Sequence, residues 1–212
     1  NEVYLHGRHS DGRSFMAIAQ HSGGFGASSR YDGYSCLCFP NNTRNIPIEV
    51  TENEARMFYL RKEFTTDSAG PGRNRGGLGQ EIEFCILDGE TELARDVESS
   101  VRLSGRTEDG TFPVFGRRGG KNGRGSGMWV NNEPVDHGIY RRLSPNDRVR
   151  FVLSGGGGYD LPQLRDPERV LFDVKEGYVS VERAKLDYGV VIDAELMEVD
   201  IEATELVRRN ML

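Results

Sequence analysis

The sequence predicts an α+β fold that is mostly β, with a glycine-rich β body and two or three short helices at the C-terminal end. Three observations support this prediction. Strand patterns fill the first three quarters of the chain, helix signals are confined to the last quarter, and 27 of the 212 residues are glycine. Since apolar residues make up only 36% of the chain, its core must be built with many turns.

The first predicted elements form a hairpin, because strand-like residues 2–6 and 15–19 flank a turn at residues 10–13. The first strand has no element before it, so we expect it to need a partner edge and the chain expressed alone to be poorly soluble or partly folded. Asn131 and Asn132 predict a tight turn in a hairpin at 129–135, since asparagine tolerates positive φ. Further strands are expected at residues 57–61, 81–86, 101–103 and 149–153, with another turn at 143–147. Residues 116–127 are interpreted as a mobile loop.

The last part of the chain carries four successive glycines, residues 155–158, and then helix signals. Asp166 and Pro167 predict the start of a helix that ends at Gly177, with one apolar face. That face consists of Val170, Leu171 and Val174. Ser180 predicts a second helix, ended by Gly189 and followed by a strand at 190–192, and Asp200 predicts a last helix over 201–208. Ile201, Leu206 and Val207 mark the less polar side of that last helix.

These signals divide the chain into a β-rich body, residues 1–153, and a glycine loop with a C-terminal helical segment, residues 154–212. We expect both to belong to one structural unit that is part of a larger subunit or complex.

Charge and composition exclude several functions. The net charge of −6 and pI of about 5.4 argue against nucleic acid or an anionic membrane as the main partner. Basic residues do gather at Arg117, Arg118, Lys121 and Arg124, which favours a solvated or subunit-facing loop over a phosphate site, since no helix start follows. The sequence shows no signal peptide and no apolar span of about 18 residues, so we expect a soluble, cytoplasmic protein.

Candidate binding residues lie beside glycines or in turns. His21 precedes a glycine-rich stretch and could bind a ligand or transfer a proton, or be a hydrogen-bonded histidine at a strand end. Asn42, Arg44 and Asn45 could hold a carboxylate, a carbonyl or a carbonyl phosphate through several donors, or brace the turn before Pro47.

Two arginines, Arg73 and Arg75, lie in the glycine-rich stretch 70–79. They could bind substrate, or the stretch could be a loop shaped for a domain or subunit contact. It is not a nucleotide phosphate loop, because no Lys-Ser/Thr follows. Cys36, Cys38 and Cys85 are odd in number and lack ligand spacing, so no metal site is predicted.

Five segments in this order carry a resemblance to a known family. They are His21–Ala27, Asn42–Val50, Ser68–Gly79, Gly119–Lys121 and the C-terminal run from Leu153 to Val191. The chain resembles the C-terminal part of the hydantoinase B/oxoprolinase family over nearly its whole length. One departure is Asp160-Leu161-Pro162, where the family commonly has Gly-Asp-Pro after the tyrosine.

The resemblance implies the C-terminal portion of a B-type subunit in an ATP-dependent complex that hydrolyses a cyclic amide such as a hydantoin, a lactam or oxoproline. The alternatives are a subunit of an ATP-dependent ketone carboxylase of the acetone or acetophenone type, and a non-catalytic assembly subunit. By the same resemblance the chain is not active alone and binds no cofactor. ATP and a divalent metal are expected on its partners, the A-type ATP-binding subunit and the N-terminal B-type portion. A small-molecule substrate is a further expected partner.

Overall fold

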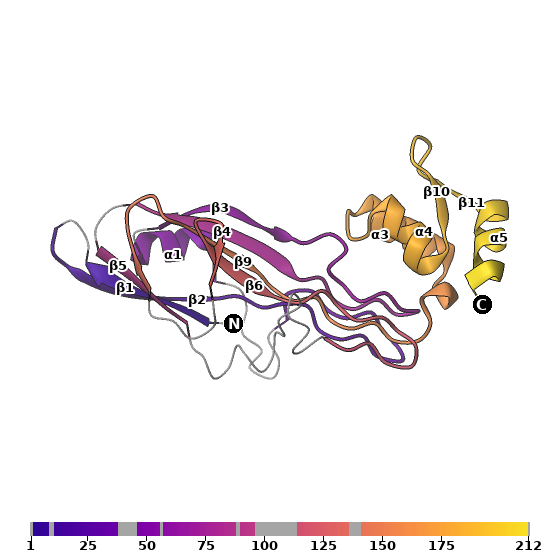
Figure 1. The fold of residues 1–212 in the computed structure, drawn as a ribbon, viewed down its shortest axis with the longest axis horizontal. Helices are drawn as coiled ribbons and strands as arrows, with labels where there is room; N and C mark the ends of the chain where they lie inside the picture. Colours follow the sequence, from indigo (N-terminus) through magenta and orange to yellow (C-terminus); the bar gives the residue numbers. More distant parts are fainter. Residues whose placement is uncertain are drawn as a thin grey trace.

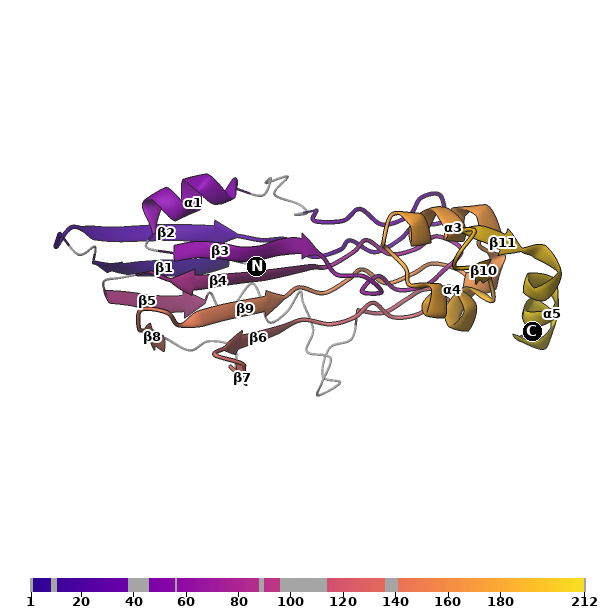
Figure 2. The same ribbon diagram turned by 90° about the horizontal axis from the view of Figure 1, so that it is seen from above.

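A computed structural model describes residues 2–8, 11–37, 46–55, 57–87, 90–95, 114–135 and 141–211. Along the longest axis a β-sandwich is followed by extended glycine-rich segments and then by a group of short helices (Figures 1 and 2). The prediction of an α+β fold that is mostly β, with short helices at the C-terminal end, is confirmed. The strand expected at 101–103 lies outside the described residues.

Two antiparallel sheets form the sandwich. The first has the order β2 (Ser14–Gln20), β1 (Glu2–Arg8), β5 (Glu90–Arg95) and β8 (Arg141–Leu143). The second has the order β3 (Met57–Phe64), β4 (Gln80–Ile86), β9 (Arg148–Val152), β6 (Gly127–Val130) and β7 (Glu133–Pro134). The hairpins at 2–20 and 129–135 are confirmed, and Asn131 and Asn132 adopt positive φ values of 53° and 66°.

The expectation that the first strand needs a partner edge was wrong, while the poor solubility expected of the chain expressed alone stays a prediction. Strand β1 lies inside its sheet, with β2 on one side and β5 on the other. The sequence could not show this, because β5 follows more than eighty residues later and its pairing depends on the closure of the sandwich.

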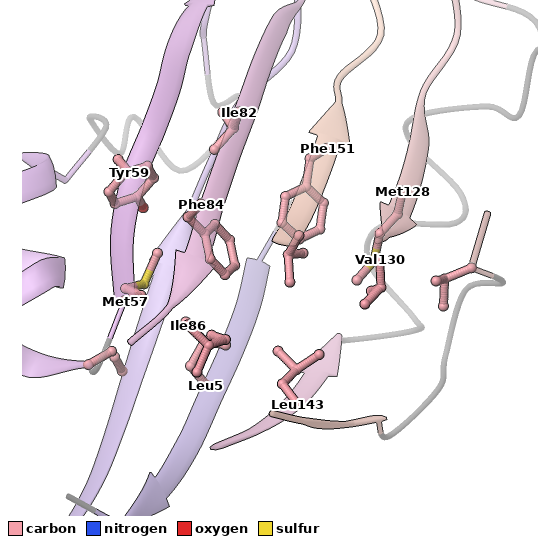
Figure 3. Packing of buried hydrophobic residues seen from close by; sticks show 14 of the residues in the cluster. Leu5, Met57, Tyr59, Ile82, Phe84, Ile86, Met128, Val130, Leu143 and Phe151 are labelled. Carbon is pink, nitrogen blue, oxygen red and sulfur yellow. The ribbon is translucent and has the colours of Figure 1, made fainter. Parts of the chain in front are cut away.

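The core of the sandwich follows from the two-residue period of its strands. In β4, Ile82, Phe84 and Ile86 are at most 1% exposed, whereas the residues between them are half-buried. They pack against Leu5 of the first sheet and Phe151 of β9 (Figure 3). Each such side chain contributes about 1.5–3 kcal/mol when fully buried.

A short helix, α1 (Ile48–Glu54), precedes β3, so the prediction that helices occur only near the C-terminus was wrong. Its seven residues are too few to show a helical period. Tertiary contacts hold it instead: Ile48 packs against the sandwich core, Thr51 is buried, and Glu52 Oε1 accepts a hydrogen bond of 2.7 Å from Tyr59 N. The helix lies beside β2 and β3 (Figure 2).

Beyond the sandwich lie four glycine-rich segments (Figure 2). Three of them turn back on themselves, as the bonds from Phe25 N to Tyr34 O, Gly76 N to Gly70 O and Gly123 N to Val114 O show. We call the four segments the glycine bundle: residues 21–35, 68–79, 114–126 and 153–160. Backbone hydrogen bonds join these segments, and nearby residues of one segment bond to different neighbouring segments. Along the central segment 153–160, the N–H groups of Gly155, Gly156 and Gly158 donate to Arg124, Gly77 and Lys121, at 2.9, 2.9 and 3.0 Å.

The four successive glycines are required by this packing rather than by a turn. A Cβ at Gly155, Gly156, Gly157 or Gly158 would overlap a backbone carbonyl of a different residue, namely Ser68, Phe25, Phe115 and Pro71 respectively. The central segment is therefore in backbone contact with all three other segments. This arrangement resembles the crowded axis of collagen, where only glycine fits.

Residues 116–127 belong to this bundle, so their interpretation as a mobile loop was wrong. Arg117 N donates to Gly158 O at 2.8 Å, Lys121 N to Pro71 O at 2.7 Å, and Arg124 N to Ser68 O at 2.8 Å. The glycines that suggested mobility instead allow the segment to approach its neighbours closely.

The C-terminal elements are η1 (Pro162–Leu164), α3 (Pro167–Lys175), α4 (Val181–Tyr188), β10 (Val191–Asp193), β11 (Glu198–Asp200) and α5 (Ile201–Met211). The predicted caps are confirmed: Asp166 accepts from Glu168 N, Ser180 from Arg183 N, and Asp200 from Ala203 N. A second core contains Val170, Leu171 and Val174. In the part of the chain that the structure describes, no helix has the length and apolarity needed to cross a membrane.

The less polar side predicted for the last helix, α5, is mostly exposed, and only Val207 of its three residues is half-buried. Ile201 and Leu206 are 68% and 62% exposed, whereas Thr204 is buried and its hydroxyl oxygen accepts a hydrogen bond of 3.0 Å from Val191 N. The helix is attached through polar groups as well as apolar ones: Arg208 donates to the carbonyls of Tyr188 and Arg165.

Candidate functional site

His21 lies where β2 leaves the sandwich and enters the glycine bundle. It is 2% exposed and its ring meets Tyr59 edge to face, with ring centroids 6.2 Å apart. Burial, together with the charge of Lys62, lowers the pKa of His21 to about 3. The imidazole is therefore neutral at physiological pH. Any role of His21 in proton transfer would start from this neutral form.

Tyr59 and Lys62, both on β3, form a polar group with His21 that sequence reasoning did not identify. Lys62 Nζ lies 5.8 Å from the centre of the Tyr59 ring and donates to Ile46 O at 3.1 Å. Burial lowers the pKa of Lys62 and raises the pKa of Tyr59 to about 12. In sequence these residues belong to an ordinary strand, and no motif marks them.

Asn42, Arg44 and Asn45 lie outside the described residues, and their proposed role stays a prediction. Lys62 bonds to Ile46, the first described residue after that segment. Of the predicted site residues that the structure describes, His21 directly follows β2, whereas Arg73 and Arg75 contact Arg165 and Asp173 of the helical part.

Arg75 is buried among structural partners. Its Nη1 donates to Gly76 O at 2.7 Å, its Nε lies 3.2 Å from Asp173 Oδ1, and its guanidinium lies 5.2 Å from the centre of the Tyr178 ring. Only 6% of the residue is exposed. Its contacts favour the second interpretation of this stretch, a shaped contact between parts of the protein, while substrate binding by Arg75 stays a prediction.

Arg73 contributes its backbone to the same region and exposes its side chain. Its carbonyl accepts a hydrogen bond of 3.1 Å from Arg165 Nη1, and its N–H donates to Asp160 O at 3.3 Å.

Arg165 is the centre of an ion-pair cluster that joins the helices to the glycine bundle. It is 2% exposed, and its guanidinium pairs with both carboxylate oxygens of Asp32, at 2.8 and 3.0 Å, and with Asp173 Oδ2 at 2.7 Å. Asp32 belongs to the glycine bundle and Asp173 to α3. Such a bidentate pair fixes direction as well as distance, so Arg165 sets the position of α3.

Asp32 gathers several donors in this cluster. Burial raises the pKa of Asp32, but the hydrogen bond and charge of Arg165, the charge of Arg169 and the N–H of Arg75 together hold it below its ordinary value. Asp32 and Arg165 were not identified from the sequence, because they are 133 residues apart and neither belongs to a chemical motif.

The described ranges contain no group of three or more His, Cys, Asp or Glu side chains that could hold a metal ion. The fold and these clusters define a β-sandwich continued by a glycine bundle on which short helices are fixed by buried charges. The class of protein is therefore one in which sequence-distant backbone segments, packed through glycines, hold a framework to which short helices are fixed.

Comparison with known proteins identifies that class. The family described as hydantoinase B/oxoprolinase matches residues 1–162. The chain belongs to the hydantoinase B/oxoprolinase family.

Three relatives represent the family's range. The beta subunit of caprolactamase from Pseudomonas jessenii is 35% identical, with 84% of this chain and 31% of that protein covered. The B-type subunit of a putative D-/L-hydantoinase from Pseudomonas sp. (strain NS671) is 30% identical, with 79% and 28% covered. The delta subunit of acetophenone carboxylase from Aromatoleum aromaticum is 28% identical, with 98% and 35% covered. This chain spans about a third of the length of these relatives.

Solved structures agree with these relatives. The ATP-dependent caprolactamase from Pseudomonas jessenii matches with a TM-score of 0.80 at 28% identity, over 98% of this chain and 37% of that one. Nucleotide-free acetone carboxylase has the same fold over 99% of this chain and 32% of its own, with a TM-score of 0.73 at 18% identity.

Proposed function

We propose that this chain is the C-terminal portion of a B-type subunit in an ATP-dependent complex that hydrolyses a cyclic amide. The observation that supports this most directly is the likeness to caprolactamase, which is present in both sequence and structure: 35% identity to its beta subunit and a TM-score of 0.80. A hydantoinase subunit is a further relative, and hydantoins and lactams share the ring amide bond.

Within such a complex the chain would act as a framework rather than as the ATP-binding part. Its buried charges are engaged in fixing α3 to the glycine bundle, and the sequence has no phosphate loop with its lysine. We therefore propose that ATP and a divalent metal are bound by an A-type subunit and by the N-terminal B-type portion. The complex would be cytoplasmic, and this chain would not be active alone.

The rival function is a ketone carboxylase subunit. It is supported by the acetophenone carboxylase relative, whose match covers 98% of this chain. Hydrolysis and carboxylation would both require a group that stabilises negative charge on an amide or enolate oxygen. A non-catalytic assembly role is the third possibility, and the structural roles of Arg75 and Arg165 are compatible with it.

One experiment separates the three. The native protein should be purified with whatever subunits accompany it, and the complex assayed with ATP against lactams, hydantoins and oxoproline, and in parallel against ketones with bicarbonate. ATP-dependent opening of a cyclic amide is the expected result. Carboxylation of a ketone would establish the rival. An assembly role would be indicated if omission of this chain dissociates the complex while the remaining subunits keep their activity when they are held together at high concentration.

A further inference from the structure

The ammonium group of Lys62, on β3, is partly withdrawn from water without a carboxylate beside it. The residue is half-buried, and within the described ranges its only hydrogen bond goes to a backbone carbonyl, that of Ile46, at 3.1 Å. No described aspartate or glutamate forms an ion pair with it. Burial of a charge is unfavourable unless the charge is paired, so these contacts leave Lys62 short of a counter-ion.

Lys121 shows the usual arrangement for comparison. Its side chain is 45% exposed, and its Nζ lies 2.7 Å from Asp187 Oδ1. Lys62 has no such contact within the described ranges. An ammonium group has three N–H donors, and the Ile46 carbonyl accepts from one donor of Lys62. Two donors therefore remain.

The polar side chains beside Lys62 do not replace a counter-ion, because they are uncharged. Nζ lies 5.8 Å from the centre of the Tyr59 ring, which is near the limit of about 6 Å for a cation–π contact. His21 is buried against the same ring, and its lowered pKa keeps it neutral. The three residues thus form a group with one positive charge and uncharged neighbours, where the chain leaves β2.

The chain around the Ile46 carbonyl supplies little negative charge. Residues 36–46 contain no acidic residue. Glu49, in α1, is exposed, and Cys36 is half-buried. Burial lowers the pKa of Lys62, and Cys36 and Glu49 offset this effect only in part. The electrostatic balance at Lys62 therefore favours a bound anion.

We propose that Lys62 binds a small oxyanion, a carboxylate or a phosphate, with Tyr59 and His21 as the uncharged neighbours of the bound anion. A lysine ammonium is a compact point charge and suits either anion, whereas the planar fork of an arginine favours bidentate pairing. Neutral His21 adds no second positive charge, so one anionic oxygen is sufficient to balance the group.

The identity of the oxyanion rests on the proposed function. Water opens a ring amide to a carboxylate and an amine, and the ATP that drives the reaction yields phosphate. Hydrogen bonds from an ammonium group to a charged oxygen are stronger than those to a neutral one. The site should therefore hold these charged species in preference to the uncharged ring amide.

The test measures how far an anion protects Lys62 from propionylation by an N-hydroxysuccinimide ester in the native assembly, by peptide mass spectrometry. The two probes are inorganic phosphate and acetate, with ionic strength held constant by sodium chloride. At an anion concentration of about four times the dissociation constant, labelling of Lys62 should slow about fivefold. Lys185, which is exposed on α4, is the internal control and should change less than about twofold. Protection by only one probe would identify which oxyanion is the ligand.

A second measurement uses variants. The protecting anion should raise the melting temperature of the wild-type assembly and of Lys62→Arg, which keeps the charge, but not of Lys62→Met, which keeps only the stem. Lys185→Met is the matched control and should respond like the wild type. Labelling is done on the wild-type protein, so it decides the question even if Lys62→Met unfolds.

Equal labelling of Lys62 in phosphate, acetate and chloride would overturn the proposal. So would slow labelling that no anion alters, because it would show that a carboxylate of the protein already pairs with Lys62. Anion protection in an assembly that opens no cyclic amide would sustain the site and reject the proposed function. Ring opening by an assembly without anion protection would sustain the function and reject the site.

Discussion

Removing the buried guanidinium of Arg165 should release the C-terminal helices from the glycine bundle while the sandwich stays folded. In Arg165→Met the apolar stem of the side chain is kept and the charge is lost. Asp173, only 2% exposed, would then keep Arg75 as its charged partner, and Asp32 would lose two hydrogen bonds of 2.8 and 3.0 Å.

The magnitude follows from removing the buried guanidinium that two carboxylates share, although Asp173 keeps Arg75 and Asp32 keeps Arg169 as a charged partner. Removal of one member of a buried ion pair costs about 3–5 kcal/mol, against about 0–1 kcal/mol for an exposed pair. Arg169→Met is the matched control, because Arg169 Nη2 donates to the same Asp32 carboxylate at 2.8 Å from a side chain that is 49% exposed. The two variants differ in the burial of the arginine and in the bonds that are lost, since Arg165 also donates to Asp173 and to Arg73 O.

Hydrogen exchange followed by mass spectrometry, on the chain in its native assembly, measures the effect segment by segment. Amides of α3 and α4 should exchange between about a hundred-fold and a few thousand-fold faster in Arg165→Met, since each 1.4 kcal/mol is a factor of ten. Amides of β4 and β9 should be unchanged. Equal exchange in the two arginine variants, or acceleration that is uniform over the sandwich and the helices, would refute the role assigned to Arg165.

Four further predictions concern single residues. Gly157→Ala should lower the free energy of unfolding by about 3 kcal/mol in urea denaturation, whereas Gly26→Ala, whose Cβ would meet only Gly157 O at 3.9 Å, should have little effect. Tyr188→Phe should leave stability unchanged or raise it by about 1 kcal/mol in the same assay, because the buried hydroxyl has no hydrogen-bond partner among the described residues; a marked loss would contradict this. Because the pKa of His21 is lowered in the folded state, the contribution of His21 to stability is fully present above about pH 6.5 and is lost as the pH falls. The free energy of unfolding should decrease by about 1.4 kcal/mol per pH unit below that value. In pH-dependent unfolding, His21→Asn should flatten this dependence of the free energy of unfolding between about pH 6 and 4. Arg75→Ala should lower turnover per assembled complex if Arg75 binds substrate, and co-elution of subunits if its role is the buried contact with Asp173, so both are measured on one preparation.

The local features of the fold were predictable from sequence because their causes are local. Asp166, Ser180 and Asp200 cap helices through their own side chains, and Asn131 and Asn132 adopt the positive φ that their turn requires. In each case the residue on which the prediction rests also makes the contact that stabilises the element. Alternation in β4 is predictable for the same reason, since every second side chain enters the core.

What could not be predicted depends on contacts between distant segments. Helix α1 is stabilised by Glu52 bonding to Tyr59 N and by packing on the sandwich, not by its own seven residues. A glycine-rich composition like that of residues 116–127 is compatible with a mobile loop and with a close-packed bundle. Only contacts with the partner segments decide between the two. The pair Asp32–Arg165 is invisible for the same reason, because neither residue has a local partner that would mark it.

The motifs that identify the family therefore report its architecture more directly than its chemistry. Gly24, Gly76 and Gly156 lie in three of the recognisable segments, and a Cβ at each would overlap backbone of another segment of the bundle. Close backbone packing of this kind constrains the residue type independently of any reaction. Relatives named as a caprolactamase subunit and as an acetophenone carboxylase subunit match 84% and 98% of the chain, as expected if one framework occurs in both. We therefore expect any influence of this chain on the choice between hydrolysis and carboxylation to come from side chains that the bundle does not constrain. Substitutions at those positions, rather than at the glycines, are the ones expected to change the reaction.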